Sequence, residues 1–293
     1  ERRAARSLHP GEDRTVSGPK VDAHQHFWRL SRGDYGWLTP DLEVIYRDFE
    51  PADLLPLMEG TGGGRTVVVQ AAPSVAETRF LLGLADATEW IAGVVGWIDM
   101  ASRSAAETLE ALAAHRALRG IRPMIQDIPD PDWMLDDRLT PAFEAVERCG
   151  LAFDALVRPV HLPRLLRLLE RHPALTVVVD HGAKPDIAGG DFETWARGIR
   201  RIAGETAACC KLSGLVTEAA SDWDDAALRP YVDQLLDCFG PERLLWGSDW
   251  PVVELAGGYT AWREASLRLL ADLTADERAA ILGGNAIRVY QLG

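Results

Sequence analysis

Eight short apolar, β-branched runs alternate with helix-like stretches along the chain, and this alternation limits the folds open to it. The runs predict strands near residues 20–26, 66–72, 91–98, 119–125, 151–157, 175–180, 209–215 and 243–248. Helical patterns occupy residues 104–117, 141–149, 162–171, 229–239, 261–270 and 275–282. Strands that alternate with helices form parallel sheets joined by right-handed crossovers, so the chain is predicted to have an α/β fold.

Eight such units in a chain of 293 residues match the size of a TIM-like (β/α)8 barrel. The competing doubly wound sheet would place a Gly-rich phosphate loop after its first strand, and that position holds Asp22-Ala23-His24-Gln25-His26. We therefore predict a single barrel domain over residues 20–293. Residues 1–19 are polar and rich in Arg, Pro and Gly, which predicts a flexible N-terminal tail.

Charge and cysteine content restrict the partners of the protein. The formal net charge of −13 disfavours nucleic acid and anionic membrane surfaces. The apolar runs are all shorter than the ~18 residues that indicate a membrane-spanning helix. Cys149, Cys209, Cys210 and Cys238 have no disulfide or zinc-ribbon spacing, which favours a reducing, cytoplasmic compartment. We expect a small-molecule partner, and the sequence leaves open whether the chain forms a homo-oligomer.

Polar side chains stand at the ends of three predicted strands. His24 and His26 are two residues apart, so on a strand they project to the same face. His181 and Asp249 end the sixth and eighth strands. Because the carboxyl ends of barrel strands surround one mouth, these four side chains are expected to converge there. Imidazoles and carboxylates bind metals and carry protons, so we predict all four as catalytic residues.

Other polar residues near the strand ends have either both a functional and a structural interpretation or a structural interpretation alone. Arg122 either binds a substrate oxygen or caps a buried carboxylate, and Lys184 either reaches the mouth or stays in its loop. Asp154, inside the fifth strand, is expected to be a buried partner of Arg158. Tyr35-Gly36-Trp37-Leu38 lies in the long first loop and is expected to form part of a lid. The remaining histidines are expected at the surface: His9, His115, His161 and His172.

At these residues the sequence resembles the amidohydrolase superfamily, in its amidohydrolase-2 branch. It is most similar to the sugar-lactonase group of L-fuconolactonase-like and L-rhamnonolactonase-like enzymes, over roughly residues 20–291. The motifs that carry the resemblance are Asp22-Ala23-His24-Gln25-His26-Phe27-Trp28, Gly120-Ile121-Arg122 with Gln126-Asp127, Asp180-His181-Gly182-Ala183-Lys184-Pro185, Lys211-Leu212-Ser213-Gly214 and Leu245-Trp246-Gly247-Ser248-Asp249-Trp250-Pro251. The resemblance implies an amidohydrolase-type barrel with the His-x-His pair and the strand-eight aspartate at its centre.

The resemblance is incomplete where a second metal would bind. Family members with two metals use a Lys or Glu from strand four and a His from strand five, and this chain offers Met124 with Gln126, then Val157 with Arg158. A binuclear site is therefore not expected. One divalent ion, zinc by ligand preference, would be held by His24, His26 and Asp249. Similar enzymes also work without metal, so metal dependence stays open.

The expected reaction is hydrolysis of a sugar-acid lactone by water. Asp249 acts as the general base, while His24, His26 and His181 polarise the carbonyl or hold a metal. Arg122, Gln126 and Lys184 are the candidate ligands of substrate oxygens. Trp28 and Trp250 either belong to the core or stack on the sugar ring. The alternatives are a metal-dependent, non-oxidative decarboxylase of an aromatic acid and a non-catalytic barrel that binds a sugar acid.

Overall fold

The computed structural model describes residue 18 and residues 20–293, so most of the predicted tail lies outside the described residues. Eight parallel strands are hydrogen-bonded in sequence order. They are β1 Val21–Gln25, β2 Arg65–Val69, β3 Ile91–Gly96, β4 Leu118–Ile121, β5 Ala152–Ala155, β6 Thr176–Val179, β7 Cys209–Leu212 and β8 Leu244–Trp246. A parallel bridge between Gln25 and Trp250 closes the ring between its first and last strands. The predicted barrel is confirmed.

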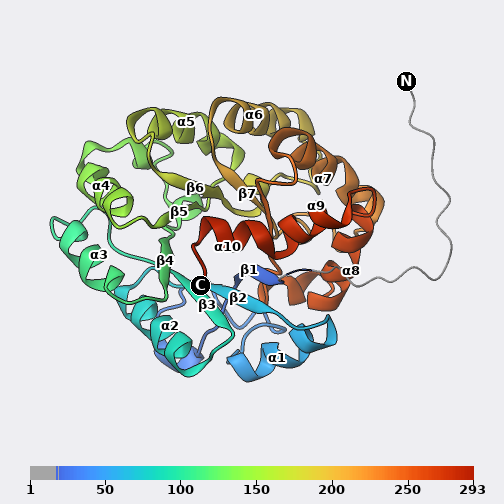
Figure 1. The fold of residues 1–293 in the computed structure, drawn as a ribbon, viewed down its shortest axis with the longest axis horizontal. Helices are drawn as coiled ribbons and strands as arrows, with labels where there is room; N and C mark the ends of the chain where they lie inside the picture. Colours follow the sequence, from blue (N-terminus) through green and yellow to red (C-terminus); the bar gives the residue numbers. More distant parts are fainter. Residues whose placement is uncertain (1–17, 19) are drawn as a thin grey trace.

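Helices surround the strands as an outer layer (Figure 1). They are α1 Pro51–Gly60, α2 Val75–Ala87, α3 Ala105–Ala113, α4 Thr140–Arg148, α5 Leu162–Arg171, α6 Phe192–Glu205, α7 Asp225–Phe239, α8 Tyr259–Leu269, α9 Ala275–Ala279 and α10 Asn285–Val289. No helix was predicted at α1, α2 or α6. The helix predicted over 275–282 is shorter than expected, because α9 ends at Ala279 and an irregular turn with extended Gly283 leads into α10.

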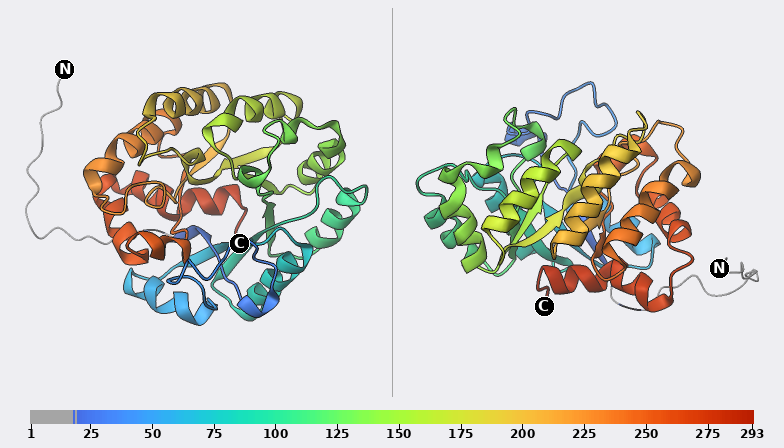
Figure 2. Two further views of the ribbon diagram at one scale, coloured as in Figure 1. Left: turned by 180° about the vertical axis from the view of Figure 1, so that it is seen from behind. Right: turned by 90° about the horizontal axis from the view of Figure 1, so that it is seen from above.

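The two ends of the barrel are closed differently. Helix α10 crosses one end (Figure 2), where Val289 and Tyr290 pack with Val21, Val67 and Val178 of the strands. The long segment between β1 and α1 rises beyond the opposite end, to which the strands point with their carboxyl termini. Among the described residues, none of the helices is long and apolar enough to cross a membrane. The candidate site therefore lies at the end away from α10.

Candidate functional site

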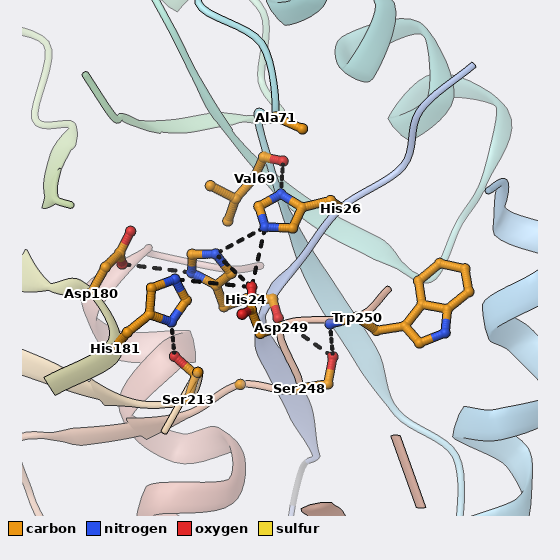
Figure 3. A network of polar contacts seen from close by, with 12 residues as sticks. His24, His26, Val69, Ala71, Asp180, His181, Ser213, Ser248, Asp249 and Trp250 are labelled. Atoms are coloured by element: carbon orange, nitrogen blue, oxygen red, sulfur yellow. Dashed lines mark hydrogen bonds and ion pairs between the residues drawn. The ribbon is translucent and has the colours of Figure 1, made fainter. Parts of the chain in front are cut away.

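Four buried side chains from three strand ends meet near the barrel axis (Figure 3). Asp249 Oδ1 lies 3.3 Å from His26 Nε2 and 3.7 Å from His24 Nε2. The same oxygen lies 3.9 Å from His181 Nε2. The structure thus brings together the four residues that the sequence analysis selected as catalytic. We call them the central cluster.

The segment that follows β8 places Asp249 against β1. Asp249 N donates to His24 O at 2.8 Å, and His26 N donates to Trp250 O at 2.7 Å. Asp249 has a left-handed φ of 58°, which aspartate tolerates better than most side chains. Gly247 permits the close approach of the two strands, because a Cβ there would lie 2.6 Å from His24 Cβ. The carboxylate is therefore fixed by backbone contacts.

The hydrogen bonding of His26 defines where its proton lies. His26 Nδ1 lies 2.8 Å from Val69 O, and a carbonyl oxygen can only accept, so Nδ1 carries the hydrogen. The lone pair of neutral His26 is then on Nε2, which faces Asp249 Oδ1 at 3.3 Å. An imidazole lone pair and an ionised carboxylate repel at this distance. The arrangement is favourable only with a proton or a cation between the two atoms.

His181 is held in an unusual backbone conformation at the end of β6. Its φ of 52° and ψ of 37° are left-handed, which is uncommon for a residue without special local support. The Ser213 hydroxyl lies 2.9 Å from His181 Nδ1. Gly214 makes room for the ring, since a Cβ there would lie 2.5 Å from Nδ1. The Lys211-Leu212-Ser213-Gly214 motif therefore orients His181 so that Nε2 faces Asp249.

Burial and neighbouring charges set the protonation of the central cluster. Burial lowers the pKa of His181 to about 4, although Asp249 opposes this shift. Burial and the nearby Lys211 ammonium hold the pKa of His24 well below its usual value. Burial alone would raise the pKa of Asp249, but His181, His26 and His24 outweigh it and lower the pKa. At neutral pH the site therefore presents an ionised carboxylate next to neutral His24 and His181.

A buried lysine lies on the α10 side of His24. Lys211 Nζ is 3.0 Å from His24 Nδ1, 2.9 Å from Asp180 Oδ1 and 2.5 Å from Asp154 Oδ2. The Tyr290 hydroxyl donates to the same oxygen of Asp154 at 2.8 Å. All of these side chains are buried. No role was assigned to Lys211 from the sequence, because its partners lie on β1, on β5 and directly after β6.

These contacts place two charged residues that were considered in the sequence. Arg122 is buried, and its Nη1 lies 3.5 Å from Asp180 Oδ2, which is the carboxylate contact expected by one of its two interpretations. The prediction that Asp154 pairs with Arg158 is wrong. Arg158 is exposed. Asp154 on β5 pairs with Lys211 on β7, because inward-facing side chains of different strands meet near the barrel axis.

A cavity of about 580 Å³ lies at the ends of β2, β3 and β4, at the same end of the barrel as the central cluster, whose four residues do not line it. Its wall includes Pro123, which follows Arg122, and Trp97, which directly follows β3. Three half-buried tryptophans and three acidic residues line it: Trp37, Trp97, Trp133, Asp34, Asp99 and Asp127. A cavity of similar volume, about 570 Å³, lies between α5, α6 and α10, away from the cluster. The first cavity is therefore the candidate substrate site.

The residues predicted to bind substrate lie mostly elsewhere. Trp28 and Trp250 are almost fully buried against Phe49, so neither presents an open face on which a sugar ring would stack. Lys184 remains in its loop and pairs with Glu218 at 2.8 Å. Of the predicted ligands of substrate oxygens, half-buried Gln126 lies beside the cavity, next in sequence to its lining residue Asp127. Of the three tryptophans that line the cavity, Trp97 directly follows a strand, and this position was its available signal in the sequence.

Two histidines predicted at the surface are buried. His161 Nδ1 accepts a hydrogen bond from the Arg158 backbone N–H at 3.0 Å, and His172 packs on Phe143. These predictions are wrong because both residues lie at helix ends that pack inward. His115 is half-buried and pairs with Asp86, while His9 lies outside the described residues. The predicted lid residue Trp37 is tied to Ala71 O through its indole N–H at 2.7 Å.

Comparison with known proteins agrees with this geometry. The sequence model of the amidohydrolase family matches residues 21–292. An L-fucono-1,5-lactonase from Burkholderia ambifaria is 46% identical over 280 residues, which cover 93% of this chain and 96% of that protein. An L-fucono-1,5-lactonase from Burkholderia multivorans is 37% identical over 293 residues, with 93% and 96% covered. A crystal structure of an amidohydrolase from Burkholderia multivorans with bound zinc superimposes with a TM-score of 0.88 at 37% identity, and covers 94% of this chain and 100% of that one. The chain belongs to the amidohydrolase family.

Proposed function

We propose that this protein is a lactonase that opens a sugar-acid 1,5-lactone by water attack on its carbonyl. The observation that carries the proposal is the fixed position of ionised Asp249 among three imidazoles at the strand carboxyl ends. The identity of 46% to an L-fucono-1,5-lactonase supports the choice of substrate. The alternative of decarboxylation usually resembles a site in which a strand-five histidine helps to hold a metal, and the residues that end and follow β5 include Ala155, Val157 and Arg158 instead.

We propose further that one zinc ion binds at His24, His26 and Asp249, which form a buried group of potential ligands. Tetrahedral zinc with bonds of about 2.0–2.2 Å separates its ligand atoms by about 3.3–3.6 Å. His24 Nε2 and His26 Nε2 are 3.3 Å apart, and Asp249 Oδ1 lies 3.7 Å and 3.3 Å from them. The spacing of these atoms therefore fits the ion, and the Val69 carbonyl orients the His26 lone pair toward it. His24 would give up the hydrogen that its contact with the Lys211 ammonium leaves on Nε2, because metal ligands bind in deprotonated form. A bound ion would polarise the carbonyl and acidify a nearby water.

The side chains of the chain itself account for the proton transfers. Asp249 accepts a proton as water attacks the carbonyl carbon, because the water becomes acidic as the new C–O bond forms. When the Ser213 hydroxyl donates to His181 Nδ1, the ring carries its hydrogen on Nε2 and stabilises the negative charge that develops on the carbonyl oxygen. The C–O bond to the ring oxygen then breaks. Asp249 returns its proton to that oxygen, which becomes the hydroxyl of the open acid.

The cavity favours a neutral, hydroxylated ring over an anionic substrate. The faces of Trp37, Trp97 and Trp133 provide apolar area for the C–H surfaces of a ring. Asp34 and Asp127 offer carboxylate oxygens that accept hydrogen bonds from hydroxyl groups. The same carboxylates would repel a substrate that carries several carboxylates. We therefore propose an uncharged aldonolactone as the substrate.

The test is an acid-release assay near neutral pH with a panel of aldono-1,5- and 1,4-lactones. The panel contains L-fucono-1,5-lactone and its epimers, and each rate is compared with spontaneous opening. We expect turnover of at least one 1,5-lactone and loss of turnover in Asp249→Asn. Failure of every lactone to react above the spontaneous rate would contradict the proposal. Carbon dioxide release from aromatic acids in a parallel assay would establish the alternative.

A further inference from the structure

The centre of the barrel contains a second group of potential metal ligands. His24, Asp180 and His181 are buried, and their ligand atoms lie within 4.8 Å of one another. His24 Nδ1 and Asp180 Oδ1 are 3.6 Å apart. His24 therefore belongs to both groups, with Nε2 facing Asp249 and Nδ1 facing Asp180. An ion in each group would bind His24 through a different ring nitrogen, with the imidazole ring between the two ions.

Two side-chain cations already contact this second group. Lys211 Nζ lies 2.9 Å from Asp180 Oδ1 and 3.0 Å from His24 Nδ1. Arg122 Nη1 lies 3.5 Å from Asp180 Oδ2 and 3.3 Å from His24 Nε2. Each carboxylate oxygen of Asp180 thus has its own cationic partner. A metal ion bound to Asp180 and His24 Nδ1 would have to displace the ammonium of Lys211.

The balance of buried charges also disfavours a second metal ion. Three buried carboxylates, Asp154, Asp180 and Asp249, stand against the two cations Lys211 and Arg122. With neutral histidines this leaves a formal charge of −1 among these five groups. One divalent ion changes that charge to 0 when His24 Nε2 gives up its hydrogen, and a second would raise it to +2. Excess charge of one sign is unfavourable in a buried environment of low dielectric.

We propose that Lys211, assisted by Arg122, supplies the positive charge of a second metal ion and so limits the central cluster to one divalent cation. Lys211 is in this sense a positioning residue, because it also fixes His24 and Asp180 without reaching the cavity. The chain lacks the strand-four and strand-five ligands of a second metal ion, and it has the cationic Lys211 on β7 instead. The proposal rests on the proposed function in one respect, which is the single ion expected at His24, His26 and Asp249.

The experiment compares the metal content of wild-type protein and of Lys211→Met in the full-length chain. Both are stripped with a chelator, dialysed against zinc and analysed for zinc per chain. Loss of the ammonium leaves Asp154, Asp180 and His24 Nδ1 unpaired and lowers the formal charge to −2. We expect the variant to bind one more equivalent of zinc than the wild type. Anomalous diffraction is expected to place the additional ion between Asp180 and His24.

Lys20→Met is the matched control, because among the described residues the Lys20 ammonium donates to the backbone carbonyls of Thr61 and Gly62, both at 3.3 Å. It is expected to bind as much zinc as the wild type. If Lys211→Met does not fold, Lys211→Gln gives the same comparison with an amide that still donates to Asp154. Equal zinc content in the Lys211 variants and wild type would overturn the proposal. So would two ions in the wild-type centre, and neither result depends on lactone turnover.

Discussion

Asparagine in place of Asp249 removes the proposed general base with little change of shape. The side chains are nearly isosteric, and asparagine also tolerates the left-handed φ of 58° found at this position. The backbone hydrogen bond from residue 249 to His24 O does not depend on the side chain. The substitution therefore changes the chemistry of Oδ1 at its contacts of 3.3–3.9 Å with the three imidazoles. The barrel itself is expected to stay closed.

The expected loss follows from the role of that oxygen. A positioned general base contributes about 10²–10⁴-fold to the rate, which corresponds to about 3–5 kcal/mol of activation free energy. We expect kcat to fall within this range in Asp249→Asn while the thermal unfolding midpoint changes little. The assay is acid release from the best lactone of the panel, with zinc content measured on the same samples. That measurement separates loss of the base from loss of a metal ligand.

Asp225→Asn serves as the control, since Asp225 lies on α7 and pairs with Arg268 at the outer surface. Its kcat is expected to match the wild type. Asp249→Ala adds a backbone test, because alanine tolerates a positive φ less well and should also lower thermal stability. A folded Asp249→Asn protein that retains kcat within a factor of about three of wild type would refute the assignment of Asp249 as the base.

Three further predictions concern the metal, the cavity and a buried glutamate. Dialysis against a chelator should abolish lactone turnover and added zinc should restore it; full activity of protein with no measurable zinc would contradict this. Trp97→Ala should raise KM about tenfold, about 1.4 kcal/mol, with a smaller effect on kcat, and an unchanged KM would show that the ring binds elsewhere. Burial raises the pKa of Glu77 from 4.5 to about 7, so the folded protein binds a proton that the unfolded chain has lost between these values. This group should therefore lower the free energy of unfolding by about 3 kcal/mol as pH rises through that range. Glu77→Gln should remove this part of the pH dependence in denaturant titrations at pH 5 and pH 8, and an unchanged slope would contradict the assignment.

The parts of the site that the sequence predicts are those that depend on strand position alone. His24, His26, His181 and Asp249 follow apolar runs, and parallel strands in a barrel carry their ends to one mouth. The pairing of Asp154 could not be predicted in this way. Its nearest charged residue in sequence was Arg158, but its partner Lys211 is 57 residues away. Such pairs depend on the stagger of the strands, which residue patterns do not define.

Some helices and the burial of two histidines were not predicted, because they depend on single residues or on the packing of one helix. Helix α1 contains Pro56 in its interior, and a proline inside a helical pattern usually ends or kinks the helix. The burial of His161 and His172 depends on how α5 packs on its neighbours. The tryptophans of the cavity belong to loops, whose course the spacing of apolar residues does not determine. The fold and the central cluster were therefore accessible from sequence, while the cavity and the buried lysine were not.

The two backbone hydrogen bonds that join β1 to the segment after β8 have a consequence for synthesis of the protein. They connect His24 and His26 with Asp249 and Trp250, and His26 lies 223 residues before Asp249 in the chain. A nascent chain still on the ribosome has its histidine pair from the start but gains its carboxylate only near the end. Zinc loading and lactone turnover should therefore begin only after Asp249 has emerged, and turnover would report that the first and last strands have met.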